Sequence, residues 1–233
     1  MIERFIHHVR VELPPAGEGA AEARGRLADR FPRTALRRMT HLGLLLGSAL
    51  DGVPLAPDDA VVYASTFGET RALEDFLASF PAASPLLFQT SIHPGGVQQV
   101  LIGRQQPVAR LWPLAGRARL VEQALLTALL EPAERVALVG GEERGTWMLA
   151  HAMASATAFA FATILTRTAA GAAGRVAFGG PGFPPVVRPE HEPDDAAPPD
   201  DPCPALEDFA RALAVRQPLA WQGGGGAWRV EWR

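Results

Sequence analysis

The sequence contains no lysine and no asparagine, and its one cysteine is Cys203. Without asparagine there is no acceptor for N-linked glycosylation, and a single cysteine cannot form a disulfide within the chain. Both absences favour a reducing compartment, and we expect the cytoplasm. All 22 basic residues are arginines, a pattern that a GC-rich coding bias explains more simply than an arginine-dependent function does.

A strong charge of either sign is also missing. The 22 basic and 25 acidic residues give a formal net charge of −3. Such a chain offers no strongly basic surface to neutralise a phosphate backbone, so nucleic acid is not an expected partner. The stretch 148–165 is long enough to cross a bilayer, but it is rich in Ala, Ser and Thr, and from Phe159 it alternates large and small residues. We predict a buried helix followed by a strand there, and no membrane span.

The chain has 233 residues, and 48% of them are apolar, enough for one well-filled core. Residues 34–140 alternate helical and strand patterns, which predicts an α/β fold with a mainly parallel sheet. The expected helices cover 34–50, 70–80, 97–102, 116–130 and 206–215, and the expected strands cover 5–13, 61–65, 108–112 and 135–140. Residues 84–96 are rich in Pro and Gly and are predicted to form a loop. Residues 159–167 and 175–178 are predicted to pair as an antiparallel edge hairpin.

The composition divides the chain into three parts. Residues 1–188 are predicted to form one domain. Residues 189–204 hold six prolines and six acidic residues, and this composition is typical of an extended, solvated linker. Residues 205–233 are predicted to form a helix and a terminal hairpin that pack on the same domain.

Isolated polar residues do not form a recognisable motif. His7 and His8 are adjacent on a predicted strand and would point to opposite faces, so no metal site is expected. Ser91 and His93 lack the Gly-x-Ser-x-Gly turn of a hydrolase. The run Gly140–Glu143 follows a strand but matches neither a P-loop nor a dinucleotide-binding fingerprint, and no cofactor is expected.

The order of elements between about residues 30 and 145 carries more information. A long helix precedes a strand that ends in Ala64-Ser65-Thr66-Phe67-Gly68. A Gly95-Gly96 turn enters a further helix, and the strand after Pro107 ends in a sharp turn at Leu114-Ala115-Gly116. This order resembles the N-terminal half of the β-ketoacyl synthases of the thiolase superfamily. The most similar members are the short chain length factors of aryl polyene and related pigment polyketide systems. The resemblance implies a thiolase-like half-fold with helices on both faces of the sheet.

The resemblance also implies that catalytic groups are missing. Active members carry a nucleophilic cysteine eight residues beyond the proline that begins the strand, and counting from Pro107 gives Ala115. Alanine has no nucleophile, so an acyl thioester could not form at this position. The two catalytic histidines of the family lie in its C-terminal half, which this sequence replaces with the acidic linker, one helix and a hairpin.

Two surfaces follow from the resemblance. In the family, the strand before the cysteine joins two sheets across a dimer axis, which makes Val108, Arg110 and Trp112 candidates for the dimer interface. A residue that gates the acyl tunnel corresponds to Phe67, although a core position beneath the following helix explains a phenylalanine there equally well. Ser91 and His93 are further tunnel candidates, in a Ser-Ile-His-Pro run where the pigment-system relatives have Ser-Val-His-Asn.

We therefore expect a non-catalytic subunit that forms a heterodimer with a full-length β-ketoacyl synthase in polyketide or fatty-acid-type elongation. An acyl carrier protein is a further expected partner. One alternative is a small acyltransferase or decarboxylase that acts on acyl carrier substrates and uses His93 with Ser91 or Glu142. A second alternative is a homodimeric protein that binds acyl chains.

Overall fold

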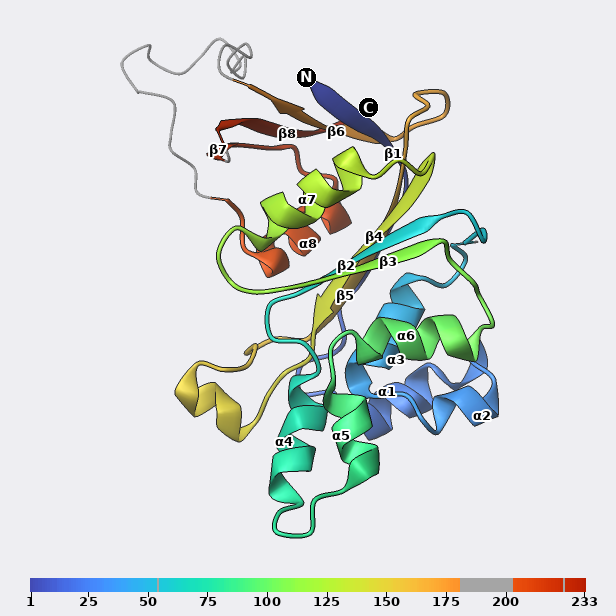
Figure 1. The fold of residues 1–233 in the computed structure, drawn as a ribbon, viewed down its shortest axis with the longest axis vertical. Helices are drawn as coiled ribbons and strands as arrows, with labels where there is room; N and C mark the ends of the chain where they lie inside the picture. The colour runs from blue at the N-terminus through green and yellow to red at the C-terminus, as the bar shows by residue number, and fades with distance from the viewer. Residues whose placement is uncertain (54, 181–202, 224) are drawn as a thin grey trace.

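The structure is a computed structural model, and it describes residues 1–53, 55–180, 203–223 and 225–233. These residues form one eight-stranded sheet with the strand order β3-β2-β4-β5-β1-β6-β8-β7 (Figure 1). The strands are β1 (Ile2–Glu12), β2 (Ala60–Ser65), β3 (Arg110–Ala115), β4 (Arg135–Glu142), β5 (Phe159–Thr166), β6 (Gly174–Gly179), β7 (Leu219–Gly223) and β8 (Gly226–Trp232).

Helices cover both faces of this sheet. They are α1 (Ala20–Arg26), α2 (Arg33–Leu36), α3 (His41–Ala49), α4 (Thr70–Ala78), α5 (Pro85–Ser91), α6 (Gly95–Gly103), α7 (Leu120–Leu130) and α8 (Leu206–Val215), with single 3-10 turns η1 (Ala28–Arg30) and η2 (Trp147–His151). On one face α7 and α8 pack against alternate residues of β2 and β4 such as Val62 and Leu138. On the other face α1, α3 and α6 pack against the intervening residues such as Tyr63 and Val139. The predicted α/β fold with helices on both faces is confirmed.

The sheet is nevertheless mostly antiparallel, and the expected predominance of parallel strands is wrong. Only the pairs of β2 with β3 and with β4 are parallel among the described strands. The remaining neighbours, from β4 and β5 through to β7 and β8, run antiparallel. Two parallel strands can be connected only by a crossover segment such as α7, whereas antiparallel strands can be connected by a short turn. The strands from β4 onward therefore need no helical crossover between them.

The predicted hairpin of residues 159–167 and 175–178 is also wrong. The two strands exist as β5 and β6, but β1 lies between them and pairs with both, so that Phe5 is opposite Thr166 on one side and Arg175 on the other. Pairing with a strand from the far end of the chain leaves no signal in the local sequence. The edge hairpin is instead β7 and β8, where the sequence predicts a terminal hairpin.

Three helical predictions need correction. The buried helix expected before Phe159 is only the 3-10 turn η2, in which Met148 alone is buried. The helix expected over 34–50 is divided into α2 and α3, because Thr40 has an extended backbone and its side-chain oxygen accepts a hydrogen bond from the Gly43 N–H at 3.1 Å. The loop expected over 84–96 contains α5, which Ser84 caps and Pro85 begins. Serine followed by proline is a favoured helix start. The serine side chain caps the first turn, and the N–H group that proline lacks would have no partner within the helix at that position.

The two ends of the chain share one core. Phe209 and Leu213 of α8 and Trp228 of β8 pack in the same cluster as Leu125 of α7. The predicted linker 189–204 lies outside the described residues except for its last two. Among the residues that the structure describes, no helix combines the length and the apolar character that crossing a membrane requires.

Candidate functional site

The carboxyl ends of β2, β3 and β4 meet at one edge of the sheet, because these strands run parallel. Ser65 lies opposite Ala115, and Ala64 lies opposite Gly140. The chain leaves β3 through Gly116, whose φ of 146° is outside the range that other residues favour. Ligands of open α/β sheets commonly bind where the carboxyl ends of parallel strands gather, so we describe this edge as the candidate site.

Ala115 and Phe67 lie on neighbouring segments of this edge. Ala115 is the last residue of β3 and is exposed. Phe67 follows β2, is half-buried and belongs to neither hydrophobic core. The guanidinium of Arg117 lies 4.9 Å from the centre of the Phe67 ring, a cation–π contact, and also donates a hydrogen bond to the Ala152 carbonyl. The structure therefore favours a position at the site over a core role for Phe67.

His93 reaches the same edge from the turn between α5 and α6. Its ring stacks on Tyr63 with 4.8 Å between ring centres, and its side chain lies against Gly68. Nδ1 of His93 is 3.4 Å from a carboxylate oxygen of the buried Glu69, whose other oxygen accepts a hydrogen bond from the Gly96 N–H at 2.7 Å. His93 therefore belongs to a buried polar cluster beside Phe67.

Ser91 does not join His93. Its hydroxyl donates a hydrogen bond to the Phe88 carbonyl within α5, at 2.8 Å. Of the two tunnel candidates in this turn, the structure thus brings only His93 to the candidate site. A serine nucleophile activated by His93 would need a direct hydrogen bond between the two side chains, and the structure shows none.

Two buried glutamates at the end of β4 organise the site, and the sequence analysis assigned no structural role to either. Glu142 accepts hydrogen bonds from the backbone N–H groups of Thr66 and Phe67 and from the Ser65 hydroxyl. Glu143 accepts from the N–H groups of Leu42 and Arg71, at 3.1 and 2.7 Å. Burial raises the pKa of both carboxyl groups to about 7. These side chains tie the loop after β2, the start of α3 and the start of α4 to one strand.

Gly140 and Gly141 lie inside β4 and serve its packing against β5. A Cβ at Gly140 would lie 2.6 Å from the Phe161 ring, and one at Gly141 would lie 2.6 Å from the Phe159 carbonyl oxygen. The glycines allow β5 to approach β4 closely. Glu142 and Glu143 come directly after them, at the end of β4.

The predicted interface strand β3 is an edge of the sheet. Arg110 and Trp112 both bond to Glu131 at the end of α7, through Arg110 Nε at 2.8 Å and Trp112 Nε1 at 2.6 Å. Burial acts to raise the pKa of Glu131, but hydrogen bonds from Trp112, Ala133 and Arg110 outweigh it and hold that pKa below its ordinary value. Trp112 is 43% exposed. Val108 lies before the strand and packs against the core on the α3 face, so the structure separates it from the exposed edge.

The candidate site contains no thiol, because the one cysteine of the chain lies elsewhere. Cys203 packs against the hydrophobic core that α7 and α8 form with the sheet, and burial raises the pKa of its thiol. No group of three or more His, Cys, Asp or Glu side chains within the described ranges is arranged to hold a metal ion. The arrangement can present an exposed strand, an aromatic ring at a loop and a buried acid–histidine pair.

No model of a known protein family and no curated protein sequence matches this chain. Solved structures define the class of the fold, which is an α/β fold shared with solved structures of ketosynthases and chain length factors. The chain is similar to a chain of the complex between a ketosynthase and its chain length factor from Xenorhabdus doucetiae, with a TM-score of 0.62 and 18% identity over 99% of this chain and 100% of that one. It is also similar to the ishigamide ketosynthase/chain length factor, with a TM-score of 0.54 and 16% identity over 77% of this chain and 68% of that one.

Proposed function

We propose that this chain is a chain-length-factor-like subunit that binds a full-length β-ketoacyl synthase and carries no acyl group itself. The observation that carries the proposal is Ala115 at the exposed end of β3, where the resemblance to active synthases calls for a nucleophilic cysteine. The similarity along the whole chain to a member of a ketosynthase–chain length factor complex supports the same role.

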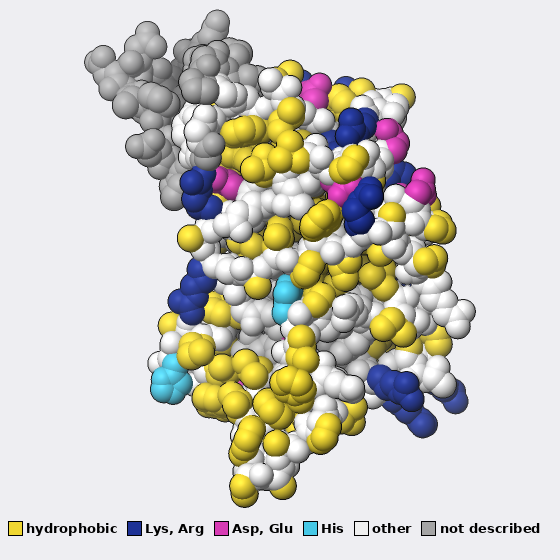
Figure 2. Space-filling model, in the orientation of Figure 1, with side chains coloured by type: hydrophobic (Ala, Val, Ile, Leu, Met, Phe, Trp, Pro, Cys, Tyr) yellow, Lys and Arg dark blue, Asp and Glu magenta, His cyan; other side chains and the backbone are white. Residues whose placement is uncertain are grey.

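The proposed contact surface begins at β3. An edge strand with unpaired backbone groups is prone to unwanted pairing unless something covers it, and no described strand pairs with β3 on its outer side. Exposed apolar side chains also gather on α4, α5 and the turn between them, namely Leu77, Phe80, Leu86 and Phe88 (Figure 2). Exposed apolar groups that cluster in this way are typical of interaction surfaces.

We propose further that Phe67 limits the space for the growing acyl chain of the partner. The Arg117 contact holds one face of its ring, and His93 lies beside the adjacent Gly68. In this proposal an acyl carrier protein delivers the chain to the synthase, and the product is a polyketide or fatty-acid-type chain of the aryl polyene kind. The proposed compartment is the cytoplasm.

Co-expression with a full-length synthase tests the pairing. We expect a one-to-one complex in native mass spectrometry, and at least a tenfold weaker complex for Trp112→Arg. Val215→Arg is the control. It makes the same kind of change at an exposed apolar residue of α8, away from β3, and this variant should bind the synthase normally. A symmetric homodimer that ignores the synthase would instead support an acyl-chain-binding protein.

Two further measurements test the roles of the site residues. With the synthase present, Phe67→Ala should lengthen the product, whereas Leu13→Ala, which removes an exposed apolar side chain just after β1, should not. Isolated chain incubated with a malonyl or acetyl donor should show no covalent mass increase. Turnover of a malonyl carrier substrate that is lost in His93→Ala would overturn the non-catalytic role.

A further inference from the structure

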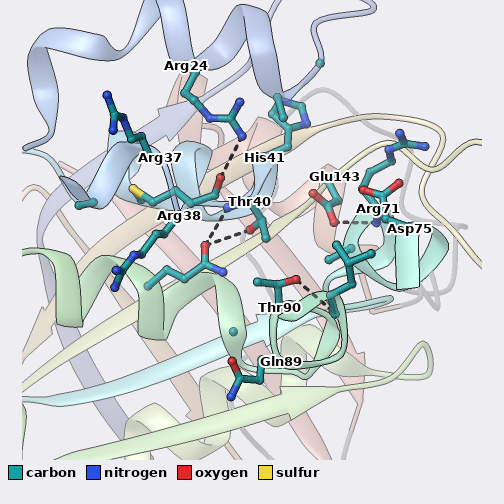
Figure 3. Close-up of a pocket in the computed structure, with 18 of the residues that line it drawn as sticks. Arg24, Arg37, Arg38, Thr40, His41, Arg71, Asp75, Gln89, Thr90 and Glu143 are labelled. Atoms are coloured by element: carbon teal, nitrogen blue, oxygen red, sulfur yellow. Dashed lines mark hydrogen bonds between the residues drawn. The ribbon is translucent and has the colours of Figure 1, made fainter. Parts of the chain in front are cut away.

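A large cleft lies apart from the candidate site and the β3 edge. It has a volume of about 1400 Å³, and residues of α1, α2, α4, α5 and α6 and the segment after β4 line it (Figure 3). Its lining includes neither Phe67, His93 nor Ala115, and neither Arg110 nor Trp112. Of the proposed contact surface only Leu86 also lines the cleft, and the proposed subunit role assigns nothing to the charged residues of the cleft.

Three arginines form one wall of the cleft. Figure 3 shows Arg24, Arg37 and Arg38 on the side opposite Arg71 and Asp75. Arg37 and Arg38 are exposed, and their guanidinium groups make no hydrogen bond or ion pair with the part of the chain that the structure describes. Nε of Arg24 is buried without a hydrogen bond partner among the same residues, and its Nη2 makes one long contact, at 3.4 Å, with the Met39 carbonyl. A buried donor without a partner costs free energy unless a ligand or water satisfies it.

The positive charge of this wall is not compensated by the acids nearby. Glu18 also lines the cleft, but both of its carboxylate oxygens accept hydrogen bonds from Arg26, at 2.6 and 2.8 Å. Across the cleft, Glu143 is already held by two backbone N–H groups. Arg71 is neutralised by Glu74 at 2.7 Å. Asp75 is exposed on the opposite side of the cleft and is a single acid against the three arginines of this wall. The uncompensated charge is thus net positive and is concentrated on the wall that α1 and the turn after α2 provide. Figure 2 shows basic side chains gathered at the α2 corner of the molecule.

The neutral groups of the cleft add hydrogen bond donors and an apolar strip. The Gln99 side-chain oxygen accepts from the Thr40 N–H at 2.8 Å, which leaves the amide nitrogen of Gln99 to donate. Leu86 and Ile102 line the cleft and are 68% and 76% exposed. Small-molecule sites usually occupy ~300–1,000 Å³, so the cleft has room for a ligand with an extended body.

We propose that this cleft binds an organic phosphate whose anionic group contacts Arg24, Arg37 and Arg38 and whose apolar body lies along Leu86 and Ile102. Guanidinium groups bind phosphate through paired, charge-assisted hydrogen bonds. A single carboxylate is satisfied by one arginine, whereas a phosphate ester carries up to two charges and more acceptor oxygens. Three arginines on one wall, none of them in an ion pair with a described acid, therefore suit a phosphate ester better than a carboxylate.

Calorimetric titration of the full chain at low salt tests the proposal, with pyrophosphate, hexyl phosphate and hexanoate as probes. We expect hexyl phosphate to bind more tightly than pyrophosphate, and hexanoate to bind at least tenfold more weakly than hexyl phosphate. Arg37→Gln and Arg38→Gln should each weaken phosphate binding about tenfold. Arg33→Gln removes the same charge from α2 outside the cleft and should change binding less than twofold. Leu86→Ser should abolish the advantage of hexyl phosphate over pyrophosphate.

Three results would overturn the proposal: no phosphate binding, equal losses for Arg33→Gln and Arg37→Gln, or hexanoate binding as tightly as hexyl phosphate. Equal losses would mean that only the overall charge attracts the anion. The arginine variants do not bear on the complex with a synthase, because Arg33, Arg37 and Arg38 lie outside the β3 edge, the apolar surface of α4 and α5, and the candidate site. Leu86 belongs to that apolar surface, so Leu86→Ser is tested only in the isolated chain.

Discussion

The parallel and antiparallel halves of the sheet are held together by different kinds of side chain. Around β3, β2 and β4, the buried carboxylates of Glu131, Glu142 and Glu143 accept hydrogen bonds from loops, helix starts and an edge strand. Around β6, β8 and β7, aromatic rings pack on one another. Trp228 stacks on Trp221 at 5.8 Å between ring centres and contacts Phe178 at 4.5 Å.

The antiparallel half therefore contributes mainly to the stability of the fold, whereas the parallel half mainly holds the groups of the proposed function in position. Stacked rings bury a large apolar area and need few specific partners, so the antiparallel half can close the core. A buried carboxylate is tolerated only when donors surround it, so each glutamate of the parallel half fixes the position of the groups that donate to it. Those groups include the backbone of Phe67 and the side chains of Arg110 and Trp112, which are the residues of the proposed function.

The largest expected effect is a loss of stability in the antiparallel half. Trp228→Ala should lower the free energy of unfolding by about 3–5 kcal/mol, because the indole is 2% exposed and its removal leaves a cavity. Trp112→Ala, at the exposed edge of the parallel half, should cost about 1 kcal/mol or less while weakening the complex with a synthase. Urea unfolding of both variants measures the contrast, and equal losses would contradict it.

The next effect is a pH dependence that belongs to the parallel half. The folded pKa values of Glu142 and Glu143 are raised to about 7, so the folded state binds these protons more tightly than the unfolded state does. The free energy of unfolding should therefore decrease as pH rises from about 5 to 8, by roughly 1–3 kcal/mol. Glu142→Gln should flatten this decrease in urea unfolding followed at several pH values. Glu134→Gln, an exposed change, serves as the control, and an unchanged slope in Glu142→Gln would refute the assignment.

Glu131 should show a smaller effect of the opposite sign. Its folded pKa is lowered, so its contribution is present above the ordinary pKa of a glutamate and is lost as pH falls. Glu131→Gln should cost about 1–2 kcal/mol near pH 7, because bonds to a charged acceptor become bonds to a neutral one. The difference between variant and parent should shrink below about pH 4. The same variant should weaken the complex with a synthase, since Arg110 and Trp112 lose their common acceptor. A cost that stays constant across pH would contradict the role of the ionised carboxylate.

The sequence predicted local elements well where one pattern dominated. The amphipathic spacing of Leu206, Phe209 and Leu213 predicted α8 with the observed bounds, and the run ending in Ser65 predicted β2 to within one residue. The prediction from sequence failed where a residue remote in sequence determines the local backbone structure. The break at Thr40 depends on Gln99 accepting its N–H and on Glu143 accepting the N–H of Leu42.

The candidate site was predictable in the same limited sense. Counting along the chain placed Ala115 at the end of a strand and Phe67 just after another, and parallel pairing brings the two strand ends together. No spacing rule linked His93 to Glu69, or Glu142 to the backbone of Thr66, because those contacts join loops that are remote in sequence. The sequence left a contact between Ser91 and His93 open. In the structure the Ser91 hydroxyl instead donates a hydrogen bond to the Phe88 carbonyl within α5.

The sequence by itself determined where apolar faces and turns fall, since periodicity, capping residues and prolines act over a few neighbouring positions. It also determined that the end of β3 holds a methyl group and no thiol. Only the tertiary structure decided that β1 separates β5 from β6, that most of the sheet is antiparallel, and that three arginines from α1 and the turn after α2 share one wall of a cleft. Strand order and the meeting of remote side chains depend on the packing of the whole chain, and no local pattern encodes that packing.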